Sequence, residues 1–481
     1  MDKEEQPKQP RPHREGIEGE VEEGEEEWSG AFDPFADPEE RRVLFASLDS
    51  FRQYRRSAHR NVTHRRRQSF YALPSLHWQT LAAPPFNLLG TFNKVDEAID
   101  ANAEVAEAIL DSALDAFQLP RHPQAGDSAK DGYGRVVSWH DTATSSDVSK
   151  ANSTIRQLYR DWSEGGAAER ETCYGPVMRD LQGEFGEKPA PGTRVLIPGA
   201  GLGRLVFDVA MAGFEAEGNE ISYHQLVTSS WVLNRTKRKE ECAVYPFVLH
   251  FSNLRTREQQ FKKVLIPDVH PGSAVRGYEM DDESSESGRR ETKKMTGSMS
   301  MTAADFLLLY NEEANREAFS AVATVFFIDT APNLIRYIQT VHHCLRPGGI
   351  WSNVGPLLWH FEDRPAPSAT AAADSSKVTE DAAASAHAPG DDDLEKEYSH
   401  GHSHGHSHNH SHHGRGHGQG EGIADPGVVE LSQDEVLALI EKMGFAVEKV
   451  EDDIGGCGYI QDPDSMLYNM YRPVHWVVRK K

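Results

Sequence analysis

The sequence predicts an α/β protein with a Rossmann-like, mainly parallel sheet covered by helices. From residue 194 onward, short apolar segments alternate with segments of helical periodicity, which is typical of a parallel sheet with crossover helices. The first apolar segment, 195–197, runs directly into a turn with glycines at 199, 201 and 203. A later helical segment is separated from the next apolar one by the turn Pro347-Gly348-Gly349.

Each element of this region follows from its residue pattern. Strands are predicted at 195–197, before Glu220, and at 245–249, 322–328, 350–354, 446–450 and 476–478. Helices are predicted at 205–212, 225–234, 334–345 and 432–443, and Ser432 with Glu435 forms a capping box at the start of the last one. Two polar insertions, about 268–300 and 365–425, are expected to be disordered surface loops.

Two regions precede the sheet. Residues 1–37 are rich in Glu, Gly and Pro and cannot bury enough apolar surface to offset chain entropy, so a disordered acidic tail is expected. Residues 38–180 carry helical patterns, which begin with Phe45, Leu48 and Phe51 and recur at 95–117 and 153–162. The predicted organisation is therefore an acidic tail, a helical N-terminal region 38–180 and an α/β domain 181–481.

The composition limits the function classes. The 481 residues carry a formal net charge of -24, which argues against nucleic acid as the main partner because phosphate binding needs clustered Lys and Arg. The 4 cysteines show no CxxC spacing, so neither a disulfide framework nor a cysteine zinc site is indicated. No apolar run approaches the roughly 20 residues of a membrane helix, and no secretory signal is recognisable. A cytoplasmic protein is expected, and Arg65-Arg66-Arg67 is a weak nuclear signal, a solvated helix face or a surface that meets acidic groups.

The glycine turn carries the chemistry. Missing side chains let the backbone approach a ligand, and the helix that follows presents free N–H groups. A dinucleotide fold would place the third glycine at position 204, but Arg204 stands there and the glycine precedes it. The spacing G-x-G-x-G is typical of class I methyltransferases, and Glu220 at the end of the second strand can accept both hydroxyls of a ribose. These features favour a site for S-adenosylmethionine over a strand–turn–helix corner without a ligand.

Several long motifs resemble the carnosine N-methyltransferase family. They are Pro198-Gly199-Ala200-Gly201-Leu202-Gly203-Arg204-Leu205, Gly218-Asn219-Glu220, Phe326-Phe327-Ile328-Asp329-Thr330-Ala331, Gly355-Pro356-Leu357-Leu358, His360-Phe361-Glu362 and Arg160-Asp161-Trp162-Ser163-Glu164-Gly165 with Glu169-Arg170. The resemblance spans roughly residues 40–481 apart from the insertions. It implies a class I methyltransferase sheet and methylation of an imidazole nitrogen of carnosine, β-alanyl-histidine, or a related histidine dipeptide. The product from carnosine is anserine, and a homodimer is compatible with the sequence.

The resemblance also implies which residues bind the cofactor. Gln157 and Arg160 are expected at the methionine carboxylate, Gly199 and Gly201 beside the ligand, Glu220 at the ribose, and Asp305 with Phe306 at the adenine. Judged from its surroundings alone, Asp305 would be an ordinary helix cap.

The substrate end needs a group that manages the imidazole proton. Displacement at a sulfonium requires a neutral, aligned nucleophile, and imidazole is half-protonated near its pKa of about 6.5. A carboxylate beside the second nitrogen fixes the tautomer and stabilises the imidazolium, as in a Ser-His-Asp triad. Asp329 follows an apolar run at the carboxyl end of a central strand, where ligands of such sheets collect, although it could instead cap a helix.

By the resemblance, three further residues contact the dipeptide: His360, Tyr459 and Tyr471. Alone, His360 would more often be a core histidine. Asn469 and Met470 stand where the family tends to have aromatic residues, which puts the affinity for the dipeptide in question.

A histidine tract raises the question of a metal. Histidines alternate with Gly, Ser and Asn between His400 and His413, and neutral imidazoles bind zinc, nickel or copper. The tract is of low complexity and has no partner ligands at fixed spacing, so no required metal is expected. Two alternatives to a dipeptide methyltransferase stay open: a protein histidine methyltransferase, and a metal-binding interaction protein on a degenerate methyltransferase scaffold.

Overall fold

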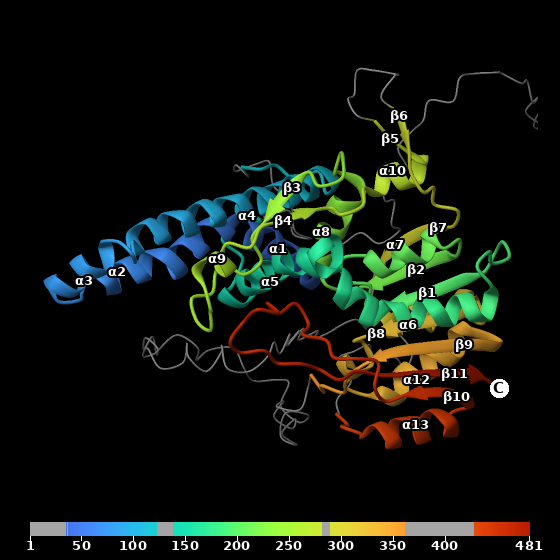
Figure 1. The fold of residues 1–481 in the computed structure, drawn as a ribbon. Helices are drawn as coiled ribbons and strands as arrows, with labels where there is room; N and C mark the ends of the chain where they lie inside the picture. The colour runs from blue at the N-terminus through green and yellow to red at the C-terminus, as the bar shows by residue number, and fades with distance from the viewer. Residues whose placement is uncertain (1–34, 36, 123–137, 281–288, 361–427) are drawn as a thin grey trace, which may run out of the picture.

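The computed structural model describes residues 35, 37–122, 138–280, 289–360 and 428–481 (Figure 1). The predictions for the acidic tail, for the insertion 365–425 and for the histidine tract lie outside the described residues, apart from Phe35 and Asp37 at the end of the tail. Within the described part of the chain, no helix is long and apolar enough to cross a membrane.

A seven-stranded sheet forms the centre of the molecule. Its order is β10-β11-β9-β8-β1-β2-β7, and its strands are β1 (Arg194–Pro198), β2 (Glu215–Glu220), β7 (Ser298–Ala303), β8 (Phe319–Val325), β9 (Leu345–Gly355), β10 (Phe445–Glu451) and β11 (Val474–Lys480). The pairs β8–β9, β1–β8, β1–β2 and β2–β7 are parallel, and β11 runs antiparallel to both of its neighbours. The predicted parallel α/β sheet is confirmed.

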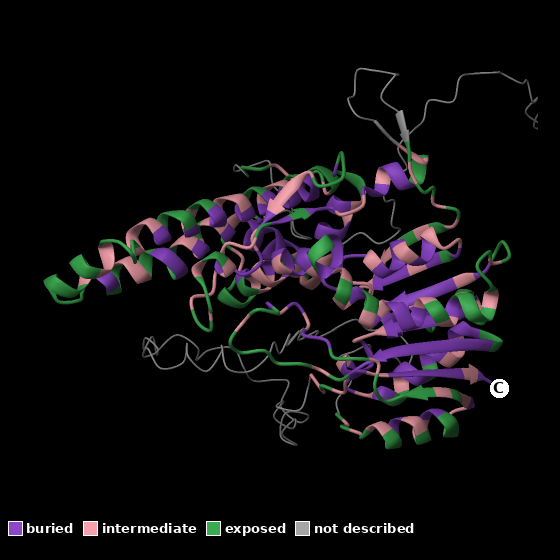
Figure 2. Ribbon diagram, in the orientation of Figure 1, coloured by how far each residue is buried: buried purple, intermediate pink, exposed green. Residues whose placement is uncertain are grey.

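Side-chain alternation along the strands explains why helices cover both faces. Leu196 and Val322 belong to a core with α11 (Phe306–Tyr310), α12 (Leu334–Cys344) and α13 (Gln433–Lys442). Their neighbours Val195 and Ala321 point the other way, into a core with α6 (Ala167–Phe185) and α7 (Arg204–Met211). Figure 2 shows these central strands as mostly buried. The capping box of Ser432 and Glu435 at the start of α13 is confirmed.

The N-terminal region is helical, as predicted. It contains α1 (Pro38–Ala58), a π-helical turn at His59–His64, α2 (Arg65–Tyr71), α3 (Ser75–Ala82), α4 (Leu88–Ala116) and α5 (Ser145–Trp162). α1 and α4 lie side by side and extend away from the sheet, with α2 and α3 at the far end (Figure 1). The apolar faces of α1 and α4 share one core with α8 (Tyr223–Asn234) and with the small sheet of β3 (Cys242–Val244) and β4 (Val264–Ile266). The composition-based boundary at residue 180 falls inside α6.

The arginine triplet meets acidic and polar groups on this region. Arg67 forms an ion pair with Asp96 at 2.6 Å, and Arg66 donates to the carbonyl of Val62 at 2.8 Å. Arg67 therefore lies on a surface that meets an acidic group.

The strand predicted at 245–249 was wrong. The strand is β3, which ends at Val244, and the chain then turns. The physical reason lies on α4: the Asn102 side chain accepts from the Tyr245 N–H at 2.8 Å and donates to the Tyr245 carbonyl at 3.0 Å. Both main-chain groups of Tyr245 are thus taken by a side chain, and the strand cannot continue.

The insertion expected at 268–300 contains ordered elements, so a loop over its whole length was wrong. It holds α10 (Pro271–Arg276) and the hairpin strands β5 (Tyr278–Met280) and β6 (Arg289–Glu291), and β7 begins inside it at Ser298. The His270 side chain caps α10 by accepting from the Ser273 N–H. β7 escaped prediction because it is an edge strand whose alternating serine and methionine residues are only partly buried.

Short helical turns complete the described chain. They are Glu164–Gly166, α9 (Arg257–Gln260), Glu313–Asn315 and Ile328–Thr330. The connection from β10 to β11, residues 452–473, crosses from the sheet to the helical region (red in Figure 1) and contacts it, since the Arg156 guanidinium on α5 donates to the Ile460 carbonyl at 3.0 Å.

Candidate active site

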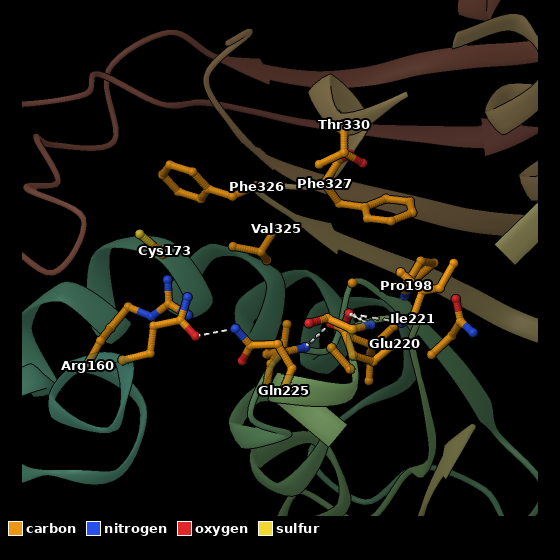
Figure 3. A pocket seen from close by; sticks show the side chains of 18 of the residues that line it. Arg160, Cys173, Pro198, Glu220, Ile221, Gln225, Val325, Phe326, Phe327 and Thr330 are labelled. Carbon is orange, nitrogen blue, oxygen red and sulfur yellow. Dashed lines mark hydrogen bonds between the residues drawn. The ribbon is translucent and has the colours of Figure 1, made fainter. Parts of the chain in front are cut away.

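A cavity of about 220 Å³ lies at the carboxyl ends of β1, β2 and β8, where α5 and α6 approach the sheet (Figure 3). Its lining comes from distant parts of the chain. It includes Gln157, Arg160, Glu169 and Cys173 on α5 and α6; Pro198, Gly199, Ala200 and Gly201 at the end of β1 and in the turn after it; Glu220, Ile221 and Gln225 at and after the end of β2; Phe306 after β7; Val325, Phe326, Phe327 and Thr330 at and after the end of β8; and His360 and Tyr459 from later segments. Ligands of open α/β sheets bind at this edge.

The turn after β1 requires its glycines. Gly199, Gly201 and Gly203 have φ values of +69°, +56° and +76°, which side chains rarely adopt. A Cβ on Gly199 would lie 2.6 Å from the Phe327 ring, and one on Gly203 would lie 2.8 Å from the Ser229 hydroxyl. At Gly201 the nearest atom would be 4.0 Å away. The backbone at Gly201 therefore faces open space in the cavity.

Glu220 is fixed at the end of β2 by main-chain donors. One carboxylate oxygen accepts from the Gly201 N–H at 2.9 Å, and the other accepts from the N–H groups of Ile221 and Ser222, each at 2.9 Å. Burial raises the pKa of Glu220, and these donors oppose that effect. A carboxylate can accept about four hydrogen bonds. Three main-chain N–H groups already donate to Glu220, so one acceptor position remains for a ligand hydroxyl.

Gln157 and Arg160 lie one turn apart on α5 and both face the cavity. The Arg160 guanidinium donates to both carboxylate oxygens of Asp161, at 2.7 and 3.0 Å. It also lies over the Tyr459 ring, 5.0 Å from its centroid. The Gln157 side-chain oxygen accepts from the amide of Gln225, which stands across the cavity on α8 (Figure 3).

Phe306 and Asp305 have different surroundings. Phe306 lines the cavity and packs edge-on against Phe327 at 5.5 Å, while Phe327 stacks on Tyr337 at 5.0 Å. Asp305 does not line the cavity, and its side chain caps α11 by accepting from the N–H groups of Leu307 and Leu308. The structure therefore assigns an aromatic wall here and gives Asp305 the cap contacts that its sequence surroundings suggest.

Asp329 lies in the turn that follows β8, just behind the cavity lining. The helix-cap alternative was wrong, because α12 is capped by the Asn333 side chain, which accepts from the Ile335 N–H. Asp329 is 2% exposed; one carboxylate oxygen accepts from the Leu358 N–H at 3.0 Å, and the other has no hydrogen-bond partner among the described residues. Burial raises the pKa of Asp329 to about 7. A carboxyl group with such a pKa can exchange a proton near neutrality.

Of the other substrate-side residues, His360 and Tyr459 line the cavity and Tyr471 does not. Burial lowers the pKa of His360, which favours its neutral form. Tyr459 lies 5.0 Å from the Phe326 ring, and Tyr471 packs behind both, at 6.0 Å from Phe326 and 6.2 Å from Tyr459. Met470 beside Tyr471 is exposed.

Several lining residues had no assigned role in the sequence interpretation, among them Phe326, Phe327, Glu169 and Cys173. The first two directly follow β8, and this position at the carboxyl end of a central strand is the signal that could have identified them. Cys173 lies with its sulfur 3.5 Å from that of Cys457, a contact between distant parts of the chain that spacing alone cannot reveal. Among the described residues, no group of three or more His, Cys, Asp or Glu side chains could hold a metal ion.

The fold and the site together define a class. A mainly parallel sheet with one antiparallel strand next to its edge, a glycine turn after the first strand and a carboxylate at the end of the second is the arrangement of class I methyltransferases.

Comparison with known proteins narrows this class to a family. A family model described as carnosine N-methyltransferase matches residues 137–481. The carnosine N-methyltransferase of Mus musculus is 36% identical over 326 residues, which cover 67% of this chain and 72% of the mouse protein. That of Schizosaccharomyces pombe is 36% identical over 329 residues, 68% of this chain and 79% of the yeast protein. The chain belongs to the carnosine N-methyltransferase family and is an S-adenosylmethionine-dependent N-methyltransferase.

Proposed function

We propose that this protein methylates an imidazole nitrogen of carnosine, giving anserine, and accepts related histidine dipeptides. One observation carries the proposal: the glycine turn after β1 and the buried carboxyl group of Asp329 after β8 lie at the same edge of neighbouring strands. The relatives in mouse and fission yeast bear the name of the same reaction.

The residues at the cofactor end fit S-adenosylmethionine. Gly201 faces open space in the cavity, where a ligand can approach the main chain, and Phe306 lines the cavity where an adenine would pack. Glu220 would accept from a ribose hydroxyl, and Gln157 with Arg160 would bind the methionine carboxylate by a charge-assisted contact. Asp305, beside Phe306, would reach the adenine only by giving up one of its cap contacts.

The mechanism follows from the groups at the other end. The bound cofactor supplies an electrophilic methyl group and a neutral thioether leaving group. Asp329 would hold the N–H of the imidazole nitrogen that does not attack, so that the second nitrogen keeps its lone pair for the methyl carbon. As the new bond forms, positive charge develops on the ring, and the Asp329 carboxylate stabilises it and accepts the proton.

The remaining substrate-side residues would orient the ring and exclude water. His360 stays neutral because burial lowers its pKa, so it does not repel an imidazolium that forms beside it. Tyr459 and Phe326 form an aromatic wall, and Tyr471 supports both. A partly apolar cavity with limited access to water strengthens electrostatic interactions with the developing charge.

The arrangement of side chains around the cavity also supports a small substrate over a protein. Side chains from α5 and α6 line one side of the cavity, and Tyr459 from the connection between β10 and β11 lines another. A histidine on a protein surface would need an open groove there.

For the cellular location we propose the cytoplasm, which localisation of the tagged protein by microscopy would test.

The direct test is methyl transfer from labelled S-adenosylmethionine to purified dipeptides. We expect labelled product with carnosine and none with β-alanyl-alanine, which has the same backbone but no imidazole. Mass spectrometry should place the added methyl group on the ring. Labelling of proteins in a cell extract with no turnover of carnosine would overturn the proposal and favour a protein histidine methyltransferase.

A further inference from the structure

The site-closing tyrosine lies in a strained piece of backbone. Tyr459 and Ile460 have φ values of +48° and +64°, so two consecutive residues with side chains are in the left-handed region. Ile460 is β-branched, and this conformation is a true outlier for such residues. Non-glycine residues stay there only when their surroundings impose it, and such residues cluster at active sites.

Two charged side chains from the helical region hold the main chain at this point. The Ile460 N–H donates to both carboxylate oxygens of Glu169, at 3.1 and 3.0 Å. The Ile460 carbonyl accepts from the Arg156 guanidinium, at 3.0 and 2.5 Å. Both polar groups of the strained peptide are therefore satisfied by groups of opposite charge, and hydrogen bonds to charged groups are the strong ones.

Burial disfavours the charged form of both side chains, Glu169 and Arg156. Burial raises the pKa of Glu169, and burial lowers the pKa of Arg156 to about 10. Keeping both charges away from water is unfavourable unless they are paired. Their hydrogen bonds with Ile460 are part of the compensation, together with the attraction of Glu169 to Arg160 and of Arg156 to Asp462.

The held segment places the Tyr459 ring in the cavity. Arg156 and Arg160 are one helical turn apart on α5; Arg156 binds the main chain of Ile460, and Arg160 lies over the ring of Tyr459. On the other side the ring meets Phe326, which has a left-handed φ of +52° itself. Two residues with left-handed backbone, Phe326 and Tyr459, thus pack their rings together at the substrate end of the cavity.

We propose that Glu169 and Arg156 are positioning residues that clamp the main chain of Ile460 and thereby hold Tyr459 over the substrate. The inference rests on the proposed function, because it assigns the clamp to binding of the dipeptide. Loss of the clamp would let the Tyr459–Ile460 backbone relax out of the left-handed region and withdraw the ring from the cavity.

The first test is Glu169→Gln, which keeps the shape and replaces the charged acceptor by a neutral amide. We expect the KM for carnosine to rise about 10-fold or more, as for a lost charged hydrogen bond, while the dissociation constant for S-adenosylmethionine changes less than about 2-fold. The matched control is Glu171→Gln on the same helix, whose side chain is exposed and pairs with Arg179 on the surface. An unchanged KM in folded Glu169→Gln, or an equal change in the control, would overturn the proposal.

Glycine at position 460 separates a clamp from a general structural role. Glycine adopts the left-handed backbone without strain, so in an Ile460→Gly background the segment needs the clamp less. Glu169→Gln should therefore raise the KM by a smaller factor in that background than in the natural one. An effect of the same size in both backgrounds would mean that backbone strain is irrelevant to what Glu169 does.

Hydrogen exchange provides a readout that does not depend on the substrate. In Glu169→Gln the amide of Ile460 should exchange at least about 10-fold faster, while peptides from β1 and β8 keep their natural rates. Unchanged exchange at Ile460 would contradict the clamp. If wild-type protein does not turn over carnosine but Ile460 still loses protection in the variant, the proposed function fails and the clamp on the backbone stands.

Discussion

The main-chain N–H of His360 donates a hydrogen bond to the carbonyl oxygen of Asp329 at 3.2 Å. The Leu358 N–H binds the Asp329 carboxylate, so the segment after β9 is fastened twice to the turn after β8. Asp329 and His360, which are both expected to contact the substrate, are therefore held as one unit at the carboxyl edge of the sheet. Their relative position does not depend on the length of the segment that follows His360.

The pKa of Asp329, raised by burial to about 7, leads to a prediction about pH. The carboxylate is the working form, so activity is lost as the pH falls through about 7. The free substrate must also lose a proton, near its own pKa of about 6.5. Log kcat/KM should therefore fall with a limiting slope of 2 at low pH in the wild type, and with a slope of 1 in Asp329→Asn. A slope of 1 in both proteins would show that Asp329 does not titrate in the reaction.

Gly199→Ala should abolish binding of S-adenosylmethionine. The added Cβ would lie 2.6 Å from the Phe327 ring in a backbone conformation that alanine rarely adopts, so either the turn or the ring must move into the cavity. Gly183→Ala on α6 is the matched control, because its Cβ would meet nothing within 4 Å. Calorimetry on the folded variants measures the affinity. Natural affinity in Gly199→Ala would mean that the turn is not part of the cofactor site.

Asp268 should contribute strongly to stability. Its carboxylate pairs with Arg170 at 2.6 Å and with Arg204 at 2.7 Å, and all three side chains are largely buried. Asp268→Ala leaves two buried guanidinium groups without this partner, so we expect a loss of about 3–5 kcal/mol in the free energy of unfolding. The exposed pair of Glu313 and Arg316 is the comparison, and Glu313→Ala should change the free energy of unfolding far less than Asp268→Ala does. Denaturant titrations that give equal losses would contradict this difference.

Removing residues 400–413 should leave kcat and KM essentially unchanged. Displacement at a sulfonium needs no metal, because the leaving group is already a neutral thioether. Treatment of the wild type with a chelator should have the same small effect. A large loss of activity in both cases, reversed by zinc in the wild type only, would make the tract a functional metal site.

The sequence predicted the fold well where local pattern and tertiary environment agree. The middle parts of β1, β8 and β11 are mainly apolar because both faces of these strands are covered, so their pattern alone identifies them. β7 lies at an edge and is only partly buried, so its serine and methionine residues carry no such signal. The end of β3 is set by Asn102 on a distant helix, which no local pattern records.

The site was predictable in the parts that follow a strand. Glu220 is the last residue of β2, and the glycine turn and Asp329 follow β1 and β8, and strand ends can be found from the sequence. The contacts of Glu169 and Arg156 with Ile460, and of Cys173 with Cys457, depend on how the connection between β10 and β11 folds back on α5 and α6. That path is a property of the whole chain.

The most direct test is to measure kcat with carnosine and the dissociation constant of S-adenosylmethionine on one folded preparation of Asp329→Asn. The amide keeps the shape and can still form hydrogen bonds, but it cannot accept the imidazole proton or stabilise the imidazolium. We predict a fall in kcat of about 10²–10⁴-fold, the usual contribution of a positioned acid–base group, with cofactor affinity nearly unchanged. A near-normal kcat, or loss of cofactor binding in place of kcat, would contradict the account.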